Sequence, residues 1–397
     1  MRYVELCAGI GGSRAGLISL GWECLLSIEI DTDTAKLHDD IFGDCLLQDV
    51  TVINPDDVPK HDVLVAGFPC QPFSTSGVQT GFQHRSGHVF DGILRVLETH
   101  LPQFVILENV GGLLSNQFGH SMGTILSHLS GLGYLVEWLL TDTTWLGIPQ
   151  TRPRVFIIAR MGANNVDQFR DLYDAVDLRG YYEHSSIFKP LLDECSVKLT
   201  PYRQGNLLST VMERSPKIGK SKPSTPTPFG PAGIALNGEF VSFKRTVYST
   251  PTSELGDICC PHFSHKSMVR SVRYYARGGP TRPTFRTRPV AHCIGTNIGT
   301  APTFGIPVEY ICDDRSKELV LEYANWNRVQ DDHVIFRLTP ERAVHLFGPG
   351  VEQISDGLKY SSLGITKQYV MLGDMVAPKM AQRIGALVET SVKNNPI

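Results

Sequence analysis

The sequence predicts an α/β protein in which a mostly parallel sheet wrapped by helices is joined to a smaller, loop-rich domain. Three observations lead to this prediction. Short apolar runs alternate with longer mixed segments through the first 160 residues, which is the pattern of a parallel sheet with crossover helices. Several of these runs end in glycines or in chemically reactive residues. From about residue 195 the composition changes to Pro, Gly, Ser, Thr and basic residues.

The predicted strands are the apolar runs Tyr3–Cys7, Leu25–Ile28, Val63–Ala66, Val105–Leu107 and Val155–Ala159. The carboxyl ends of parallel strands meet at one rim of a sheet, and ligands bind along that rim. The residues that follow the first four runs should therefore lie close together. Near the end of the chain, apolar residues at helical spacing predict a terminal helix that packs on the first domain: Val376, Met380, Ile384, Leu387 and Val388.

Charge is distributed unevenly along the chain, although the formal net charge of the 397 residues is only −3. Residues 1–160 hold 9 Lys and Arg against 17 Asp and Glu, whereas residues 195–330 hold 18 against 9. Neutralising a phosphate backbone requires clustered Lys and Arg, so the second segment is typical of a nucleic-acid-binding module. A solvated basic face is the alternative that charge alone leaves open.

The basic segment contains six closely spaced arginines with aromatic residues among them. Arginine holds phosphates and also reads guanine edges through paired hydrogen bonds, while aromatic rings pack against bases or sugars. We therefore expect nucleic-acid contacts from Arg270, Arg273, Arg277, Arg282, Arg286 and Arg288.

The cysteines and the hydropathy pattern indicate the compartment. Nine cysteines are scattered singly apart from one adjacent pair, and a chain of this size needs no disulfide framework. No apolar run is long enough to span a membrane, so a reducing cytoplasm is expected. Cys259, Cys260, His262 and His265 lack a standard zinc spacing, and no metal site is expected there.

A glycine-rich turn, Cys7-Ala8-Gly9-Ile10-Gly11-Gly12, follows the first predicted strand and opens a helix. Bare backbone can approach a nucleotide-like ligand at such a turn. A dinucleotide site would have a third glycine where this chain has Arg14, so an adenosyl ligand is favoured over NAD. Glu29, at the end of the second strand, is placed to accept hydrogen bonds from ribose hydroxyls. A tight structural turn is the alternative explanation of the glycines.

Three further segments bring reactive side chains toward the same rim. Cys70 stands between two prolines, which indicates a rigidly presented thiol rather than a small buried hydrophobe. Glu108 directly follows an apolar run, where partial burial should raise its pKa and suit it to protonate or hydrogen-bond a ring nitrogen. Arg152 and Arg154 precede the last of the five strands. The alternatives are an inert cysteine, a structural acid and a surface salt bridge.

Together these motifs resemble those of the cytosine-5 DNA methyltransferase family, in the same order and over nearly the whole chain. The most specific are Pro69-Cys70-Gln71, Glu108-Asn109-Val110 and the Gln-x-Arg-x-Arg segment that ends at Arg154. The glycine turn, Glu29 and Asp49 match the cofactor motifs of the family. Weaker matches are the helix-opening segment at residues 86–90 and the ninth and tenth motifs at residues 337–340 and 368–376.

The resemblance implies a Rossmann-like, S-adenosylmethionine-dependent methyltransferase domain at residues 1–190 and 340–397, and a target-recognition domain at residues 191–339. The catalytic residues that it implies are Cys70, Glu108, Arg152 and Arg154. The implied cofactor-binding residues are Cys7, Ala8, Gly9, Gly11, Gly12, Glu29, Ile30, Asp49, Val50, Pro69, Val89, Asp374, Met375 and Val376. Gln71 and Ser74 join the six arginines as implied DNA contacts.

The activity that the resemblance implies is methyl transfer from S-adenosylmethionine to carbon 5 of a cytosine flipped out of double-stranded DNA. Carbon 5 is too weak a nucleophile unaided, so addition of Cys70 at carbon 6 would create a reactive enamine. Glu108 would stabilise the cytosine protonated at N3, and Arg154 with Arg152 would support the base and orient the thiol. A monomer associated with the nucleoid, with a restriction endonuclease as companion, is the implied setting.

Two alternatives remain open on sequence grounds. One is an RNA cytosine methyltransferase built on the same scaffold, which the arginine-rich insert argues against. The other is a catalytically silent DNA-binding relative, which the intact Cys70, Glu108 and Arg154 argue against. The silent relative is considered because Asp374 stands where the family typically has asparagine and because Glu341-Arg342 reverses the usual order of the ninth motif.

Overall fold

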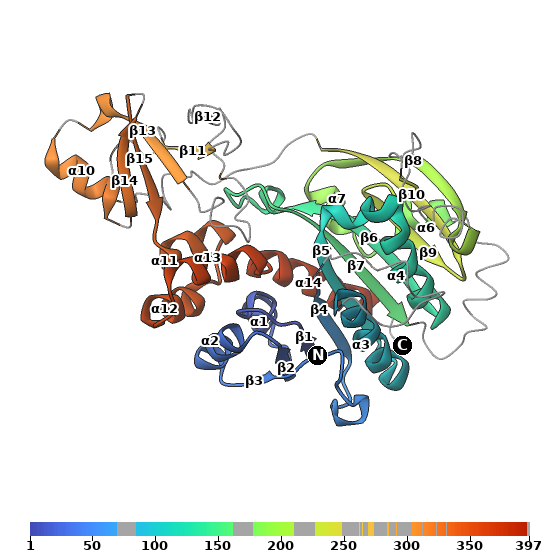
Figure 1. The fold of residues 1–397 in the computed structure, drawn as a ribbon. Coiled ribbons are helices and arrows are strands. Elements are labelled where there is room, and N and C mark those ends of the chain that lie inside the picture. Colours follow the sequence, from blue (N-terminus) through green and yellow to red (C-terminus); the bar gives the residue numbers. More distant parts are fainter. Residues whose placement is uncertain are drawn as a thin grey trace, which may run out of the picture.

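The computed structural model describes residues 1–69, 85–161, 178–209 and 227–247, and beyond them residues 262, 264, 269–273, 284–285, 291, 303–311, 313–322, 324–330 and 332–394. Ten strands form one large sheet in the order β3-β2-β1-β4-β5-β7-β6-β9-β10-β8 (Figure 1). These strands are β1 (Arg2–Leu6), β2 (Glu23–Glu29), β3 (Cys45–Leu47), β4 (Val63–Gly67), β5 (Phe104–Val110), β6 (Tyr134–Asp142), β7 (Pro153–Met161), β8 (Val197–Asn206), β9 (Ala232–Leu236) and β10 (Glu239–Val247).

The direction of strand pairing changes at β5. From β3 to β5 every neighbouring pair is parallel, whereas β7 runs antiparallel to β5 and all later pairs are antiparallel. The short connection between β6 and β7 contains only the 3-10 turn Thr143–Leu146, and a connection without a crossover helix joins antiparallel strands. The α/β class is confirmed, with the parallel part confined to five strands of a mixed sheet.

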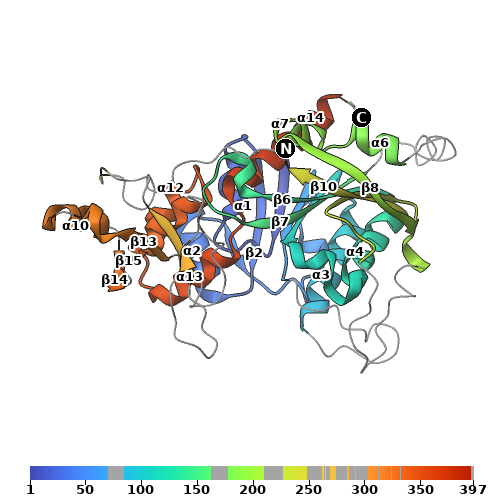
Figure 2. The same cartoon turned by 90° about the horizontal axis from the view of Figure 1, so that it is seen from above.

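Helices cover both faces of the sheet, because its strands are apolar on both sides. Alternate residues of β4 enter different clusters of buried side chains, Val63 and Val65 on one face and Leu64 and Ala66 on the other. One face is covered by α1 (Gly12–Ile18) and α14 (Pro378–Asn394), with α6 (Leu178–Ser185) and α7 (Lys189–Glu194) farther along; the other is covered by α3 (Arg85–His100) and α4 (His120–Gly131) (Figure 2).

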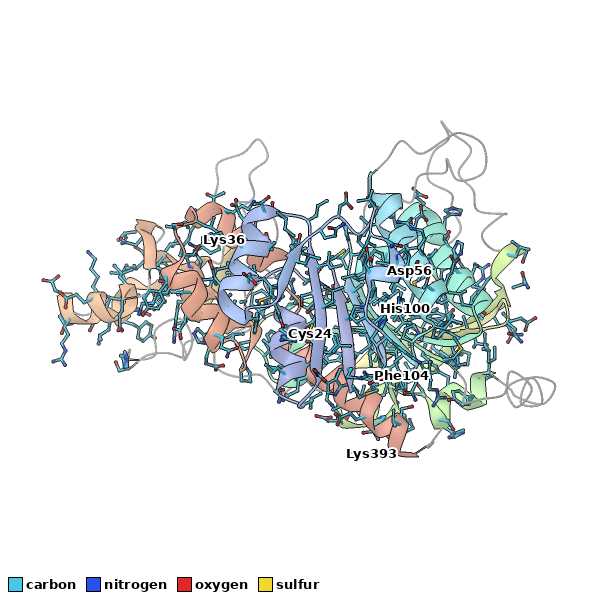
Figure 3. All side chains as sticks on the ribbon, turned by 90° about the horizontal axis from the view of Figure 1, so that it is seen from below. Cys24, Lys36, Asp56, His100, Phe104 and Lys393 are labelled. Carbon is cyan, nitrogen blue, oxygen red and sulfur yellow. The ribbon has the colours of Figure 1, made fainter. Side chains whose placement is uncertain are left out.

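Side chains fill the space between these layers. Figure 3 shows Phe104 within the packed interior, where it is 1% exposed, and Lys393 at the edge of the molecule; the side chain of Lys36 is 74% exposed. Burying one such side chain contributes about 1.5–3 kcal/mol to folding. No described helix is both long enough and apolar enough to cross a membrane.

The terminal helix packs on the first domain, as predicted, although it begins at Pro378 and Val376 precedes it. A Cβ on Gly16 of α1 would lie 2.3 Å from the carbonyl oxygen of Pro378, so the two helices touch at their backbones. Trp22 Nε1 donates a hydrogen bond of 2.8 Å to Glu389 Oε1 in α14. Met380, Ile384, Leu387 and Val388 are buried against this face.

A second, five-stranded sheet lies at the opposite end of the molecule from β8 and β10, in the order β12-β11-β13-β15-β14 (Figures 1 and 2). Its strands are β11 (Arg270–Arg273), β12 (Thr284–Phe285), β13 (Thr303–Pro307), β14 (Ala324–Gln330) and β15 (His333–Leu338), with α10 (Asp314–Leu321) beside them. The chain returns through α11 (Pro340–Ala343), α12 (Glu352–Tyr360) and α13 (Ile365–Asp374), and α12 packs on α2 (Thr32–Phe42).

The two sheets divide the residue range 191–339 that we expected to form one separate domain. β11 to β15 do lie in a sheet of their own, but β8, β9 and β10 extend the large sheet beyond β6. All five residues of β9 are buried: its backbone pairs with β6 on one edge and with β10 on the other, and its side chains enter the buried clusters on both faces of the sheet. The boundary at residue 191 therefore does not coincide with a change of sheet.

Candidate active site

Residues that follow four of the parallel strands meet at one rim, as the strand pattern predicted. The Gly9 amide after β1 donates a 2.9 Å hydrogen bond to Glu29 Oε2 at the end of β2. Asn109 Nδ2 in β5 donates a 2.8 Å hydrogen bond to the carbonyl of Phe68, which follows β4. A Cβ on Gly67 would lie 3.7 Å from Glu108 Oε2. The rim therefore brings the glycine turn, Glu29 and Glu108 into one neighbourhood.

The glycine turn needs its glycines for two separate reasons. Gly9 and Gly11 have φ values of 57° and 84°, a left-handed conformation that favours glycine. A Cβ on Gly11 would lie 2.3 Å from the Phe42 ring, and one on Gly12 would lie 2.1 Å from the Val376 carbonyl oxygen. A Cβ on Gly9, in contrast, would meet nothing within 4 Å. The turn is thus tightly packed at Gly11 and Gly12 and open at Gly9, where a ligand can approach the backbone.

Glu29 is held at the rim by backbone amides. Its Oε1 accepts hydrogen bonds of 2.9 Å from the amides of Ile30 and Asp31, and its Oε2 accepts the one from Gly9. Two carboxylate oxygens offer about four acceptor positions, so one remains for a ligand hydroxyl. Ile30 beside it is 55% exposed and provides an apolar surface. A carboxylate beside an exposed aliphatic side chain fits the ribose and the base of a nucleoside.

Glu108 and Arg154 form an ion pair at the same rim. Arg154 Nε lies 3.0 Å from Glu108 Oε1, and the two side chains are 13% and 12% exposed. Val110 pairs with Arg154 across the antiparallel β5–β7 ladder, which puts Arg154 diagonally opposite Glu108 on the same face. Burial raises the pKa of Glu108, as the sequence predicted, while the positive charges of Arg154 and Arg152 oppose that rise.

Arg152 lies in different surroundings from Arg154. Its side chain is 1% exposed, and its Nη2 donates hydrogen bonds to the carbonyls of Gly373 at 2.8 Å and Met375 at 2.6 Å. The guanidinium carbon lies 5.0 Å from the centre of the Phe347 ring. Arg152 therefore contacts the C-terminal end of α13 and the chain that follows it.

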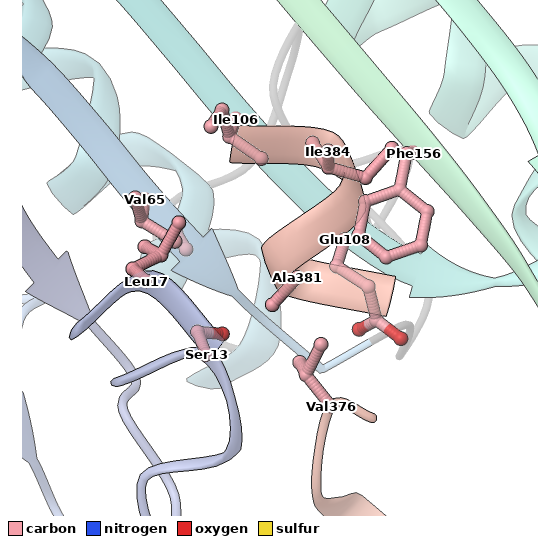
Figure 4. A pocket seen from close by; sticks show the side chains of 10 residues that line it. Ser13, Leu17, Val65, Ile106, Glu108, Phe156, Val376, Ala381 and Ile384 are labelled. Carbon is pink, nitrogen blue, oxygen red and sulfur yellow. The ribbon is translucent and has the colours of Figure 1, made fainter. Parts of the chain in front are cut away.

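Two small cavities of about 10 Å³ flank Glu108, each with room for about one water molecule. One lies toward α1 and α14 and is lined by Ser13, Leu17, Phe156, Val376 and other largely apolar residues (Figure 4). The other is lined by more polar residues, among them Thr141, Thr143, Arg152 and Arg154. Glu108 thus lies between a cavity next to the glycine turn and a cavity next to Arg152 and Arg154.

Several expected site residues lie outside the described residues or are described only in part. Outside them lie Cys70, Gln71, Ser74, Arg277, Arg282, Arg286 and Arg288. The backbones of Arg270 and Arg273 belong to β11, without described side chains. Of the other expected cofactor residues, Pro69 is exposed, Val89 is half-buried in α3, and Asp49 accepts a 2.8 Å hydrogen bond from the Thr51 amide. Among the described residues, no three His, Cys, Asp or Glu are grouped to hold a metal ion.

Two contacts that the sequence did not reveal support the arginine segment. Arg245 of β10 lies 4.8 Å from the ring centre of Trp145, in the turn that precedes this segment. Ala291, between β12 and β13 in sequence, donates a 2.7 Å hydrogen bond to Pro149 O and accepts one of 3.0 Å from the Thr151 amide. The only sequence signals are an arginine in an alternating strand and an alanine near the basic cluster, and neither is specific.

Comparison with known proteins identifies the family. The family model described as C-5 cytosine-specific DNA methylase matches residues 1–222, more than half of the chain, and the protein belongs to this family. The type II methyltransferase M.DsaV of Dactylococcopsis salina is 37% identical over 178 residues, which are 45% of this chain and 51% of that relative. M.BsuFI of Bacillus subtilis is 40% identical over 158 residues, which are 40% of this chain and 39% of the relative. The matches thus span about half the length of these relatives or less.

Solved structures show the same fold over nearly the whole chain. A mutant of Spodoptera frugiperda DNMT2 aligns with a TM-score of 0.54 at 14% identity, covering 98% of this chain and 99% of that one. The Entamoeba histolytica methyltransferase EhMeth aligns with a TM-score of 0.54 at 13% identity, covering 99% and 98%. At such low identity these similarities establish the fold alone.

Proposed function

We propose that the protein transfers a methyl group from S-adenosylmethionine to carbon 5 of a cytosine flipped out of a specific duplex DNA sequence, through a covalent adduct with Cys70. The observation that carries the proposal is the buried Glu108–Arg154 pair, with 3.0 Å between Nε and Oε1, on the rim that also holds the glycine turn. An acid of raised pKa beside a nucleoside-like site can hold a proton for a ring nitrogen.

The described residues fit an adenosyl cofactor. Open space above Gly9, the Glu29 carboxylate and the exposed Ile30 offer backbone, acceptor and apolar surface within one short stretch of the rim. When bound, S-adenosylmethionine supplies an electrophilic methyl group on a sulfonium centre. The neighbouring segment Asp374 to Val376 closes the site beside Gly12.

The chemistry assigned to the protein itself begins at Cys70. As the thiolate, its sulfur forms a bond to carbon 6 of cytosine while protonated Glu108 donates its proton to N3, so that an electron pair becomes available at carbon 5. Arg154 fixes the Glu108 carboxyl in position. After the methyl group has been accepted, carbon 5 loses its proton to a base and the bond between sulfur and carbon 6 breaks. Asn109 holds the chain that leads to Cys70, because its side-chain amide donates a hydrogen bond to the carbonyl of Phe68, two residues before the cysteine.

We further propose that residues 191–339 recognise the DNA, because this range carries the arginine-rich segment. The protein would act in the cytoplasm at the nucleoid, as a monomer, with a restriction endonuclease as companion. The curated relatives are named type II methyltransferases, which is consistent with such a companion.

The test is methyl transfer by the full chain to duplex DNA and, separately, to tRNA, together with trapping on duplexes that contain 5-fluorocytosine. Transfer to DNA and a covalent complex that Cys70→Ser abolishes would support the proposal. Transfer to tRNA alone would favour the RNA enzyme. DNA binding without transfer or a trapped complex would leave a silent DNA-binding protein.

A further inference from the structure

The four residues Gly373 to Val376, which are the last two of α13 and the two that follow it toward α14, are pressed between the glycine turn and Arg152. On one side, a Cβ on Gly12 would lie 2.1 Å from Val376 O and 2.6 Å from Met375 Cγ. On the other side, Arg152 Nη2 donates to the carbonyls of Gly373 and Met375. We call Gly373 to Val376 the linker; it has the expected cofactor site against one flank and a buried arginine against the other.

The surroundings of Arg152 account for its burial. A guanidinium removed from water is costly unless hydrogen bonds satisfy it. The last carbonyls of a helix lack partners within the helix and carry a partial negative charge, so they are suitable acceptors for a cation. Arg152 meets such carbonyls at the end of α13, and its planar group lies over Phe347. These contacts tie the guanidinium group to the end of α13 and to Phe347.

We propose that Arg152 is a positioning residue that holds the linker against the glycine turn, and thereby shapes the cofactor site, while Arg154 faces the catalytic carboxyl. The inference deepens the proposed function and rests on it. It differs from the expectation that both arginines support the flipped base. Although the two arginines belong to one motif, the structure gives them different partners: Arg152 donates to the carbonyls of Gly373 and Met375, and Arg154 pairs with Glu108.

The linker also lies between the glycine turn and the arginine segment, which are the two parts of the site. Met375 and Val376 are buried, whereas Asp374 between them and Gly373 is exposed toward the rim. A linker released from Arg152 would lose its fixed distance from Gly12, and the pocket for the cofactor would widen. The effect should therefore appear first in cofactor affinity, before any effect on the chemistry at Glu108.

The experiment measures the Kd of S-adenosylhomocysteine by calorimetry, with the Tm of each variant alongside. Arg152→Lys keeps the charge but replaces the planar group by a shorter ammonium. Arg152→Met removes the charge as well. The matched control is Arg160→Lys near the other end of β7, because Arg160 donates to Ser391 of α14 at 3.0 Å and to Tyr181 of α6, far from the linker.

Arg152→Lys should raise the Kd about tenfold, which corresponds to about 1.4 kcal/mol. Arg160→Lys should leave the Kd within about twofold even if its Tm falls, because distant sites act independently. Arg152→Met should in addition move the pH dependence of kcat toward higher pH, because loss of the positive charge lets the pKa of Glu108 rise. Arg152→Lys should leave that pH dependence in place.

An unchanged Kd in Arg152→Lys would overturn the inference while leaving the proposed function intact. A wild-type protein that binds no S-adenosylhomocysteine would overturn both. If the Arg152 variants show no cooperative unfolding, the Kd of the Phe347→Leu variant tests the inference instead, since this substitution removes only the ring beneath the guanidinium. We expect this variant to weaken binding roughly threefold, and an unchanged Kd would reject the positioning role.

Discussion

Arg154 Nε lies 3.0 Å from Glu108 Oε1, and the two side chains belong to strands that run in opposite directions. The start of β7 reaches the rim where β5 ends because of that antiparallel pairing. Both side chains are about seven-eighths buried, so neither charge is well compensated by water. Removing either partner leaves the other as a poorly solvated charge.

Replacing Arg154 with alanine should lower kcat for methyl transfer about 10²- to 10³-fold, the usual cost of removing a positioned group from a transition state. Without this cation the pKa of Glu108 should also rise. Steady-state kinetics on duplex DNA measure the loss. Arg160→Lys provides the control, because Arg160 contacts Ser391 and Tyr181 and not Glu108. A kcat within about twofold of wild type for Arg154→Ala would contradict the assigned role.

Asp374→Asn should lower the pKa of Glu108, because the negative charge of Asp374 now raises it. If protonated Glu108 is the active form, activity should then begin to decline at lower pH than in the wild type. The measurement is kcat over roughly pH 6 to 9. Asp356→Asn, at an exposed acid of α12, should leave the profile in place. A shift of the Asp374→Asn profile to higher pH would show that the sign is wrong.

Gly12→Ala should weaken cofactor binding and also destabilise the fold by about 1–3 kcal/mol, as overpacking does. The added methyl group would lie 2.1 Å from the Val376 carbonyl oxygen, and backbone cannot yield as a flexible side chain does. Thermal unfolding and calorimetry with S-adenosylhomocysteine measure the two effects. Gly131→Ala is the matched control, since its Cβ would meet nothing within 4 Å. Equal stability of the two variants would contradict the close contact.

Glu137 should make the protein less stable as pH rises from about 4.5 to about 7. Burial raises its pKa from 4.5 to about 7, so the folded chain keeps a proton that the unfolded chain has lost. Folding then binds a proton, and the free energy of unfolding falls with pH across this window, by up to about 3 kcal/mol.

Glu137→Gln should remove most of this fall, because glutamine does not titrate. Its amide oxygen can still accept from the Ser186 hydroxyl and the Ile187 amide, so the fold should be kept. Urea unfolding at pH values below and above the window provides the comparison. A residual fall of the same sign is expected from Glu5, which is 2% exposed and whose pKa burial raises to about 8. A variant as pH-dependent as the wild type would exclude Glu137 as the source.

The sequence alone determined the features that depend on local patterns. Apolar runs located β1, β2, β4, β5 and β7 to within one to three residues at either end, because a strand buried on both faces must be apolar throughout. The glycine turn and Glu29 were placed at one rim by the rule that parallel strand ends coincide, and Glu108 was expected to have a raised pKa because it directly follows a buried run.

Only the tertiary structure decided how strands and motifs far apart in sequence meet. The composition of an apolar run does not indicate in which direction the strand runs within the sheet. The antiparallel orientation of β7, which brings Arg154 to Glu108, is therefore visible only in the strand pairing of the folded protein. The shared motif implied one role for Arg152 and Arg154, yet Arg152 binds the linker and Arg154 binds the carboxylate of Glu108. Likewise β8 to β10 joined the large sheet, because backbone hydrogen bonds to β6 depend on non-local pairing rather than on composition.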